Sequence, residues 1–276
     1  MVDSDKPEVL ASRPVDLGEA TMQTSEQSDL VGAYFDRISL SYRRRFEAEN
    51  PFHNYFFRDR LRVATAGLAF ENKSVLDIGA GTGPLYDEMI NHAGLDYYAC
   101  DISAKMLSQS SIPIARQFVG KATEIELPRD RFDYIFLLGV TTYQSPAELE
   151  QTLAFISARL APFGKAILSF TNRSSLDHVC RSVLRLAKPI ISSGVIAQAF
   201  ATHAYSRAEV TEMIERQNLY VERSTFLNHT FSPFNTLLPQ ASVSFAKFIT
   251  ANCPAALLGA CSADFIVFIE QKASRV

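Results

Sequence analysis

The architecture of this chain follows from residues 74–89, which read S-V-L-D-I-G-A-G-T-G-P-L-Y-D-E-M. The apolar residues Val75, Leu76 and Ile78 predict a strand that is buried on both faces. Glycines follow at positions 79, 81 and 83, and Pro84 then stands where a first helical residue belongs, because its fixed φ suits that position. A strand, a glycine turn and a helix start predict a nucleotide-binding site, since glycine lets the backbone approach a ligand and the helix start offers free N–H groups.

Two acidic residues lie near the ends of the first two predicted strands. Asp77 comes two residues before the first glycine, where its carboxylate can accept from an ammonium group of a ligand. Asp101 ends the strand-like segment 97–101, at about the distance at which such folds place a ribose-binding carboxylate. The glycine spacing is G-x-G-x-G, and Pro84 follows where a dinucleotide fingerprint has its third glycine.

Three segments together resemble class I S-adenosylmethionine-dependent methyltransferases: V-L-D-I-G-A-G-T-G, Y-A-C-D-I-S-A-K-M-L and D-R-F-D-Y-I-F-L-L-G-V. The resemblance covers roughly residues 30–227. It implies an α/β fold, namely a Rossmann-like doubly wound seven-stranded sheet with N-terminal helices. It also implies S-adenosyl-L-methionine as the cofactor and methyl transfer as the reaction.

The resemblance further implies how the cofactor is bound. Asp101 would accept from the ribose hydroxyls, and Ile102 and Met106 would lie near the adenine. Many relatives carry an acid just before the residue equivalent to Ala122, whereas this chain has Lys121, so the Ala122 backbone or Thr123 must read the adenine amino group. The predicted cofactor-binding residues are Tyr34, Tyr42, Asp77, Gly79, Ala80, Gly81, Gly83, Asp101, Ile102, Met106, Ala122, Thr123, Leu138 and Gly139. For the two tyrosines, packing of the first helix against the core is the alternative.

The acceptor is expected beside the fourth predicted strand, residues 133–138, because doubly wound sheets bind ligands at the carboxyl ends of their strands. Val140 and Tyr143 are therefore predicted to contact the acceptor, together with His178. A general base is needed only when the acceptor must lose a proton. His203 is the candidate base, and a surface or capping role is its alternative.

Two long segments, 171–204 and 228–263, each follow a predicted core strand. The second is rich in Phe, Leu and Ile and is too apolar for a solvated loop of this length. We expect both inserts to cap the acceptor pocket, and their composition favours an apolar or lipid-linked acceptor. The alternatives for the second insert are that it extends the core or forms the interface of a homodimer.

Length and composition predict one sizeable domain. The chain has 276 residues, of which 47% are hydrophobic and 21% charged, which is ordinary for a globular protein. We expect a flexible tail over residues 1–28 and a single domain over 29–276, opening with N-terminal helices over 29–70. The formal net charge of −3 argues against nucleic acid as a partner, since sequence-independent binding needs a basic surface.

The four cysteines show neither C-x-x-C spacing nor a metal-ligand cluster with histidine, so no metal site and a reducing compartment are predicted. No segment has the eighteen or so apolar residues that cross a bilayer, and the N-terminus lacks the pattern of a signal peptide. These observations predict a cytoplasmic protein without stable membrane insertion.

The favoured function is therefore methyl transfer to an oxygen or nitrogen atom of a small-molecule acceptor. A dinucleotide-dependent oxidoreductase is one alternative. Pro84 in place of a glycine and the sequence of the fourth predicted strand argue against it. A binding protein that has kept the cofactor fold without catalysis is the other. Hydrolase and zinc-enzyme functions have no support, because neither G-x-S-x-G nor H-E-x-x-H occurs.

Overall fold

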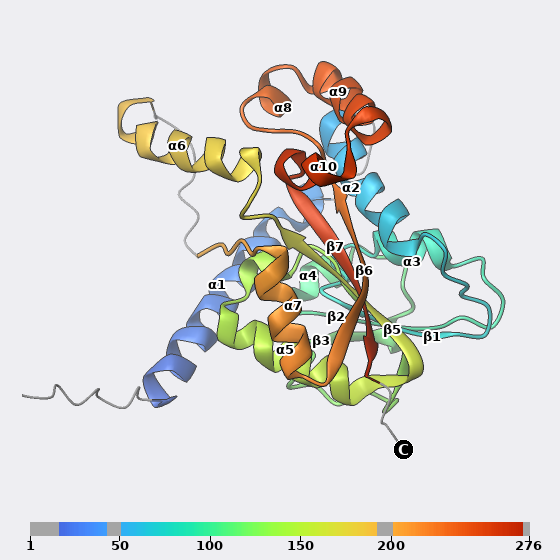
Figure 1. Cartoon of the computed structure of the whole chain (residues 1–276). Helices are drawn as coiled ribbons and strands as arrows, with labels where there is room; N and C mark the ends of the chain where they lie inside the picture. Colours follow the sequence, from blue (N-terminus) through green and yellow to red (C-terminus); the bar gives the residue numbers. More distant parts are fainter. Residues whose placement is uncertain (1–16, 43–50, 192–200, 273–276) are drawn as a thin grey trace, which may run out of the picture.

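The computed structural model of the protein describes residues 17–42, 51–191 and 201–272. Its centre is a seven-stranded sheet with the strand order β3-β2-β1-β4-β5-β7-β6 (Figure 1). This is the Rossmann-like sheet that the sequence predicts. The strands are β1 (Ser74–Ile78), β2 (Asp96–Asp101), β3 (Gln117–Val119), β4 (Phe132–Leu137), β5 (Leu160–Thr171), β6 (Leu219–Leu227) and β7 (Asp264–Gln271).

The sheet has its switch point between β1 and β4. Strand β1 pairs in parallel with β2 on one side and with β4 on the other, so the chain winds in opposite directions from this position. Strand β7 runs antiparallel to both β5 and β6. Because β6 and β5 are both antiparallel to β7, they run parallel to each other. Strand β6 therefore ends at the same edge of the sheet as β5. The insert 228–263 therefore leaves the sheet at the edge where ligands bind, a point that the sequence pattern leaves open.

Helices cover both faces of the sheet. Helices α5 (Pro146–Arg159) and α7 (Arg207–Arg216) pack on the face that presents Leu76 and Ile78, and they lie side by side in Figure 1. Each begins with a capping box, formed by Ser145 and Glu148 in α5 and by Ser206 and Glu209 in α7. Helices α2 (Pro51–Thr65), α3 (Pro84–Met89) and α4 (Ala104–Leu107) pack on the other face.

Helix α1 (Leu17–Tyr42) contacts α4 near the carboxyl edge of the sheet. It begins inside the segment for which a flexible tail is expected, so residues 17–28 differ from that expectation. The reason is local, because this segment contains Glu, Ala, Met and Gln, which favour helices, and no proline after Pro14. The rest of the expected tail, residues 1–16, lies outside the described residues.

The two inserts are mainly helical. The first contains α6 (Leu176–Ile191), and the second contains α8 (Phe234–Leu237), α9 (Pro239–Asn252) and α10 (Ala255–Cys261). Helix α10 contacts α6, and α9 contacts α2. Figure 1 shows all four beyond one end of the sheet. Within the described ranges, no helix is both long enough and apolar enough to cross a membrane.

Candidate active site

A cavity of about 250 Å³ lies at the switch point of the sheet, between the glycine turn and helix α1. We call it the glycine-turn cavity. It is lined by residues from the ends of β1, β2 and β4, as the doubly wound topology requires. Twelve of the residues predicted from the sequence line it: Tyr42, Gly79, Gly81, Asp101, Ile102, Met106, Ala122, Thr123, Leu138, Gly139, Val140 and Tyr143.

The glycine turn depends on backbone geometry that side chains oppose. Gly79 has a φ of 73° and Gly81 a φ of 57°, both in the left-handed region. A Cβ added to Gly79 would lie 2.2 Å from Cγ2 of Val140. The amides of Gly79 and Ala80 both donate to the Cys100 carbonyl, at 2.7 and 3.1 Å. The turn is thus held against β2 and leaves space above it for a ligand.

Asp101 is fixed at the end of β2 by two backbone amides. Its Oδ2 accepts from the Gly81 N–H and its Oδ1 accepts from the Ser103 N–H, each at 2.8 Å. Burial raises the pKa of this carboxyl to about 6. A carboxylate has about four lone-pair sites, so Asp101 can still accept from two hydroxyl groups of a ligand in the cavity. This capacity is what a ribose requires.

Asp77 lies within β1 and is not among the residues that line the cavity. Its Oδ2 accepts from the Tyr97 hydroxyl at 2.6 Å, on the face that packs against α2 and α3. Burial raises the pKa of the Asp77 carboxyl to about 7. Its predicted contact with a ligand ammonium group stays a prediction. Tyr34, Ala80 and Gly83 also lie outside the lining, and Gly83 is the N-cap residue of α3.

Helix α1 closes one side of the glycine-turn cavity. Gln27 Nε2 donates to the Tyr143 carbonyl at 2.9 Å, and the Ser28 hydroxyl donates to Glu148 at 3.1 Å. Phe35 lines the cavity and packs edge-on against Tyr143, with 5.3 Å between the ring centroids. Of the two predicted tyrosines, Tyr42 lines the cavity and Tyr34 lies outside the lining. Phe35 is a second aromatic residue of this helix at the cavity, and the sequence analysis does not single it out.

Gln144 is a cavity residue that the sequence analysis does not single out. Its Nε2 donates to the Thr152 hydroxyl at 2.8 Å, which fixes the orientation of the amide. Its Oε1 is buried and has no hydrogen-bond partner among the described residues. This oxygen is available to accept from a ligand amino group, the role that Lys121 cannot fill. Its position next to Tyr143 is the signal that would have found it.

A second cavity, of about 360 Å³, adjoins the first and shares Tyr42, Gly139 and Tyr143 with it. We call it the aromatic cavity, because Phe52, Phe56 and Phe57 of α2 form one wall. The other walls are polar and include His178, His203, Arg60, Asp177 and Asp264. Two of the predicted acceptor-site residues, His178 and Tyr143, and the predicted base His203 thus meet in one cavity.

His203 is held by its backbone and presents an unpaired ring nitrogen. Its N–H donates to the Thr142 carbonyl at 2.7 Å, and the Thr142 hydroxyl donates to the His203 carbonyl at 3.0 Å. The ring nitrogen Nε2 is buried and finds no hydrogen-bond partner in the described part of the chain. A histidine so placed can exchange a proton with a ligand in the cavity.

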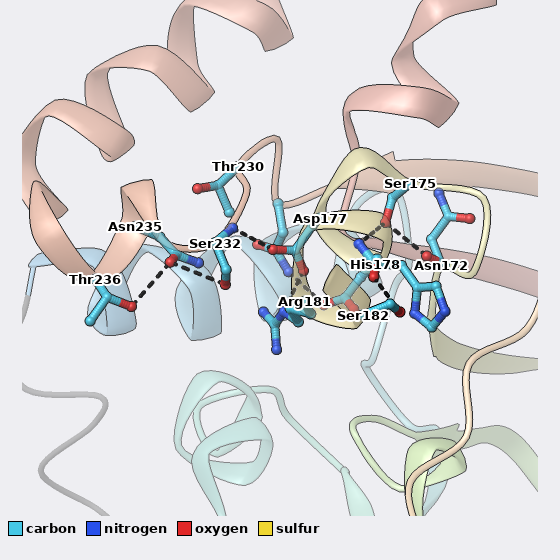
Figure 2. A network of polar contacts seen from close by, with 12 residues as sticks. Asn172, Ser175, Asp177, His178, Arg181, Ser182, Thr230, Ser232, Asn235 and Thr236 are labelled. Atoms are coloured by element: carbon cyan, nitrogen blue, oxygen red, sulfur yellow. Dashed lines mark hydrogen bonds and ion pairs between the residues drawn. The ribbon is translucent and has the colours of Figure 1, made fainter. Parts of the chain in front are cut away.

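The two inserts are joined beside the aromatic cavity. The Ser232 amide donates to Asp177 Oδ1 at 2.7 Å, and Arg181 Nε lies 2.7 Å from the other carboxylate oxygen (Figure 2). Asp177 belongs to the first insert and Ser232 to the second. The first insert supplies His178, Arg181 and His203 to the cavity wall, whereas of the second insert Ala263 lines it. The second insert thus mainly supports the first.

Among the described residues, no group of three or more His, Cys, Asp and Glu side chains is arranged to hold a metal ion.

Comparison with known proteins gives one family match and several similar folds. Residues 46–224 match the family model described as "Methyltransferase domain". No curated protein sequence matches the chain.

Three solved structures illustrate the likeness of fold. Magnesium protoporphyrin IX methyltransferase from Synechocystis PCC 6803, with bound S-adenosylhomocysteine, is 12% identical with a TM-score of 0.59, over 88% of this chain and 98% of that one. The 1,6-didemethyltoxoflavin-N1-methyltransferase of Burkholderia thailandensis is 15% identical with a TM-score of 0.56, over 95% and 93% of the two chains. A SAM-dependent methyltransferase from Thermotoga maritima is 17% identical with a TM-score of 0.54, over 87% and 99%.

Proposed function

We propose that this chain, which belongs to the methyltransferase domain family, transfers a methyl group from S-adenosylmethionine to an oxygen or nitrogen atom of a small molecule. The family match covers well over half of the chain and decides against the oxidoreductase alternative. The enzyme is an S-adenosylmethionine-dependent methyltransferase, and what we propose is the acceptor class and the residues that serve it.

The residues of the glycine-turn cavity fit S-adenosylmethionine. The glycine turn leaves room that a side chain would fill, and the Asp101 carboxylate is aimed at the same space with free lone pairs. Ile102 and Met106 supply apolar surface beside the adenine, and Gln144 Oε1 can accept from the adenine amino group. When bound, the cofactor supplies an electrophilic methyl group on a sulfonium sulfur.

The acceptor occupies the aromatic cavity. One observation carries this assignment: the two cavities meet at Gly139 and Tyr143, directly after the carboxyl end of β4. An acceptor in the aromatic cavity can therefore face a methyl group presented from the glycine-turn cavity. Holding the two reactants in line lowers the activation barrier by several kcal/mol. The enclosed volume suits a small molecule with an aromatic or other apolar portion.

His203 removes the proton when the acceptor is a hydroxyl or ammonium group. His203 lines the aromatic cavity, and its Nε2 has no hydrogen-bond partner in the described part of the chain. Two hydrogen bonds between the His203 backbone and Thr142 hold the residue in place. His178 and Tyr143 orient the acceptor from the same cavity.

A methyl-transfer screen tests the proposal. The full chain is incubated with methyl-labelled S-adenosylmethionine and a collection of phenols, amines and carboxylic acids, and labelled products are identified by mass spectrometry. For a hydroxyl acceptor, we expect His203→Gln to lower the rate of methyl transfer by roughly a hundredfold, with unchanged affinity for S-adenosylhomocysteine, because the general base is lost. His92→Gln is the matched control, because His92 pairs with Glu71 outside both cavities. A rate that His203→Gln leaves unchanged would exclude His203 as the base.

A further inference from the structure

The Arg60 guanidinium lies beside Gly139, one of the residues at which the two cavities meet. Arg60 projects from α2 into the wall of the aromatic cavity, and its side chain is only 13% exposed. A Cβ added to Gly139 would lie 2.8 Å from Nη1 of Arg60, so the guanidinium lies against the backbone that follows β4. Its Cζ is 4.8 Å from the centroid of the Phe56 ring. A positive charge is thus held between an aromatic wall and the expected site of methyl transfer.

This guanidinium is incompletely partnered. Its Nη2 donates to Asp264 Oδ2 at 3.0 Å, and that same oxygen also accepts from Asn228 Nδ2 at 2.8 Å. Its Nε is buried and finds no hydrogen-bond partner within ranges 17–42, 51–191 and 201–272. A guanidinium carries five N–H donors, and a buried donor without a partner is unfavourable. Arginine–carboxylate ion pairs are frequently bidentate, with two N–H groups donating to the two carboxylate oxygens, whereas Arg60 donates to Asp264 through Nη2 alone.

The acidic residues of the same cavity are already engaged. Asp177 accepts from Arg181 and from the Ser232 amide, and Asp264 accepts from Arg60 and Asn228. Each carboxylate is therefore matched by an arginine and one further donor. Arg181 differs from Arg60 because its side chain is 49% exposed, so water can serve its remaining donors. Arg60 is the buried cation whose remaining donors a ligand can complete.

We propose that Arg60 binds a carboxylate of the acceptor, so that the substrate class is a small organic acid with an aromatic or other apolar body. The proposal rests on the proposed function, because it takes the aromatic cavity as the acceptor site. Charge-assisted hydrogen bonds from Arg60 hold the carboxylate, and the rings of Phe52, Phe56 and Phe57 pack against the body of the acid. Arg60 then acts as a specificity-determining residue, which selects acids over neutral molecules of the same shape.

Matched pairs of acid and amide test this proposal. The probes are benzoate with benzamide, 4-hydroxybenzoate with 4-hydroxybenzamide, anthranilate with 2-aminobenzamide, and decanoate with decanamide. Binding to the full chain saturated with S-adenosylhomocysteine is measured by saturation-transfer NMR and calorimetry. In at least one pair we expect the acid to bind about tenfold more tightly than the amide. The proposal is wrong if no acid is preferred over its amide, whether or not the amides bind.

Variants assign the preference to Arg60. Arg60→Gln should abolish it, and Arg62→Gln should keep it, because Arg62 lies on the same helix with its side chain 67% exposed and paired with Asp59. The double variant Arg60→Gln with Asp264→Asn removes both charges of the buried pair, so it serves if the single variant does not fold. A preference that survives in a folded Arg60 variant would overturn the assignment.

The outcomes separate this proposal from the proposed function. Methylation of a neutral small molecule, with no acid preferred in binding, would leave the proposed function standing and exclude the role of Arg60. Acids that compete with S-adenosylhomocysteine itself would show that the aromatic cavity is not a separate acceptor site, and both assignments would then be wrong.

Discussion

Two buried carboxylates on neighbouring strands have different surroundings and different consequences. Asp101 lines the glycine-turn cavity and accepts from two backbone amides, whereas Asp77 lies within β1, outside the cavity lining, and accepts from Tyr97. Burial raises the pKa of both, to about 6 for Asp101 and about 7 for Asp77. The first therefore affects cofactor binding, and the second affects the stability of the fold.

Asp101→Asn should weaken binding of S-adenosylhomocysteine by roughly tenfold to a hundredfold, because charge-assisted hydrogen bonds to the ribose are lost. The carboxylate is the stronger acceptor, so the affinity of the unmodified chain should be constant above neutral pH. It should fall as the pH drops through about 6, where Asp101 gains its proton. Calorimetry between pH 5 and pH 8 measures both effects. The role of Asp101 would be wrong if the variant kept the full affinity.

Asp77→Asn should flatten the dependence of stability on pH. The pKa of Asp77 in the folded chain is about 7, above the value of about 3.9 for an unfolded chain. The folded state therefore binds the proton more tightly, and the stability that this group contributes is complete below pH 4 and lost as the pH rises through 7. The linked change in the free energy of unfolding is roughly 4 kcal/mol.

Urea denaturation at pH 5 and pH 8 checks this linkage. The control is Asp130→Asn, because the side chain of Asp130 is fully exposed. Equal pH dependence in the unmodified chain and Asp77→Asn would show that Asp77 does not titrate in this range.

The glycine turn is the element that positions the cofactor. A side chain at Gly81 would enter the glycine-turn cavity, and its left-handed φ of 57° would add backbone strain. Gly81→Val should therefore abolish binding of S-adenosylhomocysteine. Gly67→Val is a matched control, since Gly67 has a φ of 77° and no atom within 4 Å of an added Cβ. If both variants lose stability alike but Gly81→Val still binds the ligand, the turn does not form the cofactor site.

The contact between the inserts is a second element to test. Asp177 holds the Ser232 amide and Arg181 together at the start of α6 (Figure 2). Asp177→Ala should release the second insert from the first and leave the glycine-turn cavity intact. We expect amide hydrogen exchange in residues 230–238 to become about tenfold faster, with unchanged affinity for S-adenosylhomocysteine. Unchanged exchange in this segment would show that Asp177 does not join the inserts.

The elements differ in how far the sequence predicts them. The strand before Gly79 and the helix that begins at Pro84 depend on local patterns, and both are confirmed. The direction of β6 depends on its hydrogen-bonding partner β7, which no local pattern reveals. The start of α1 at Leu17 differs from the expected tail, because the segment before residue 28 combines a polar composition, typical of tails, with residues of high helix propensity.

For the whole molecule, the cofactor side was easier to predict than the acceptor side. The glycines of the turn and Asp101 lie within about 20 positions of one another in the sequence, so a sequence motif predicts them. Arg60 and Asp264 are 204 positions apart and meet through α2 and β7, so their pairing needed the tertiary structure. The same holds for the meeting of His178 and His203 with the aromatic wall of α2 in one cavity.

Equilibrium dialysis of the full chain against S-adenosylhomocysteine and, separately, against NAD⁺ tests the identity of the cofactor site. We predict one S-adenosylhomocysteine bound per chain, with a dissociation constant between about 1 µM and 1 mM, and no retention of NAD⁺. We also predict that the Asp101→Asn variant binds less S-adenosylhomocysteine at the same concentrations. Retention of NAD⁺, or no retention of S-adenosylhomocysteine by the folded chain, would contradict the assignment of the glycine-turn cavity.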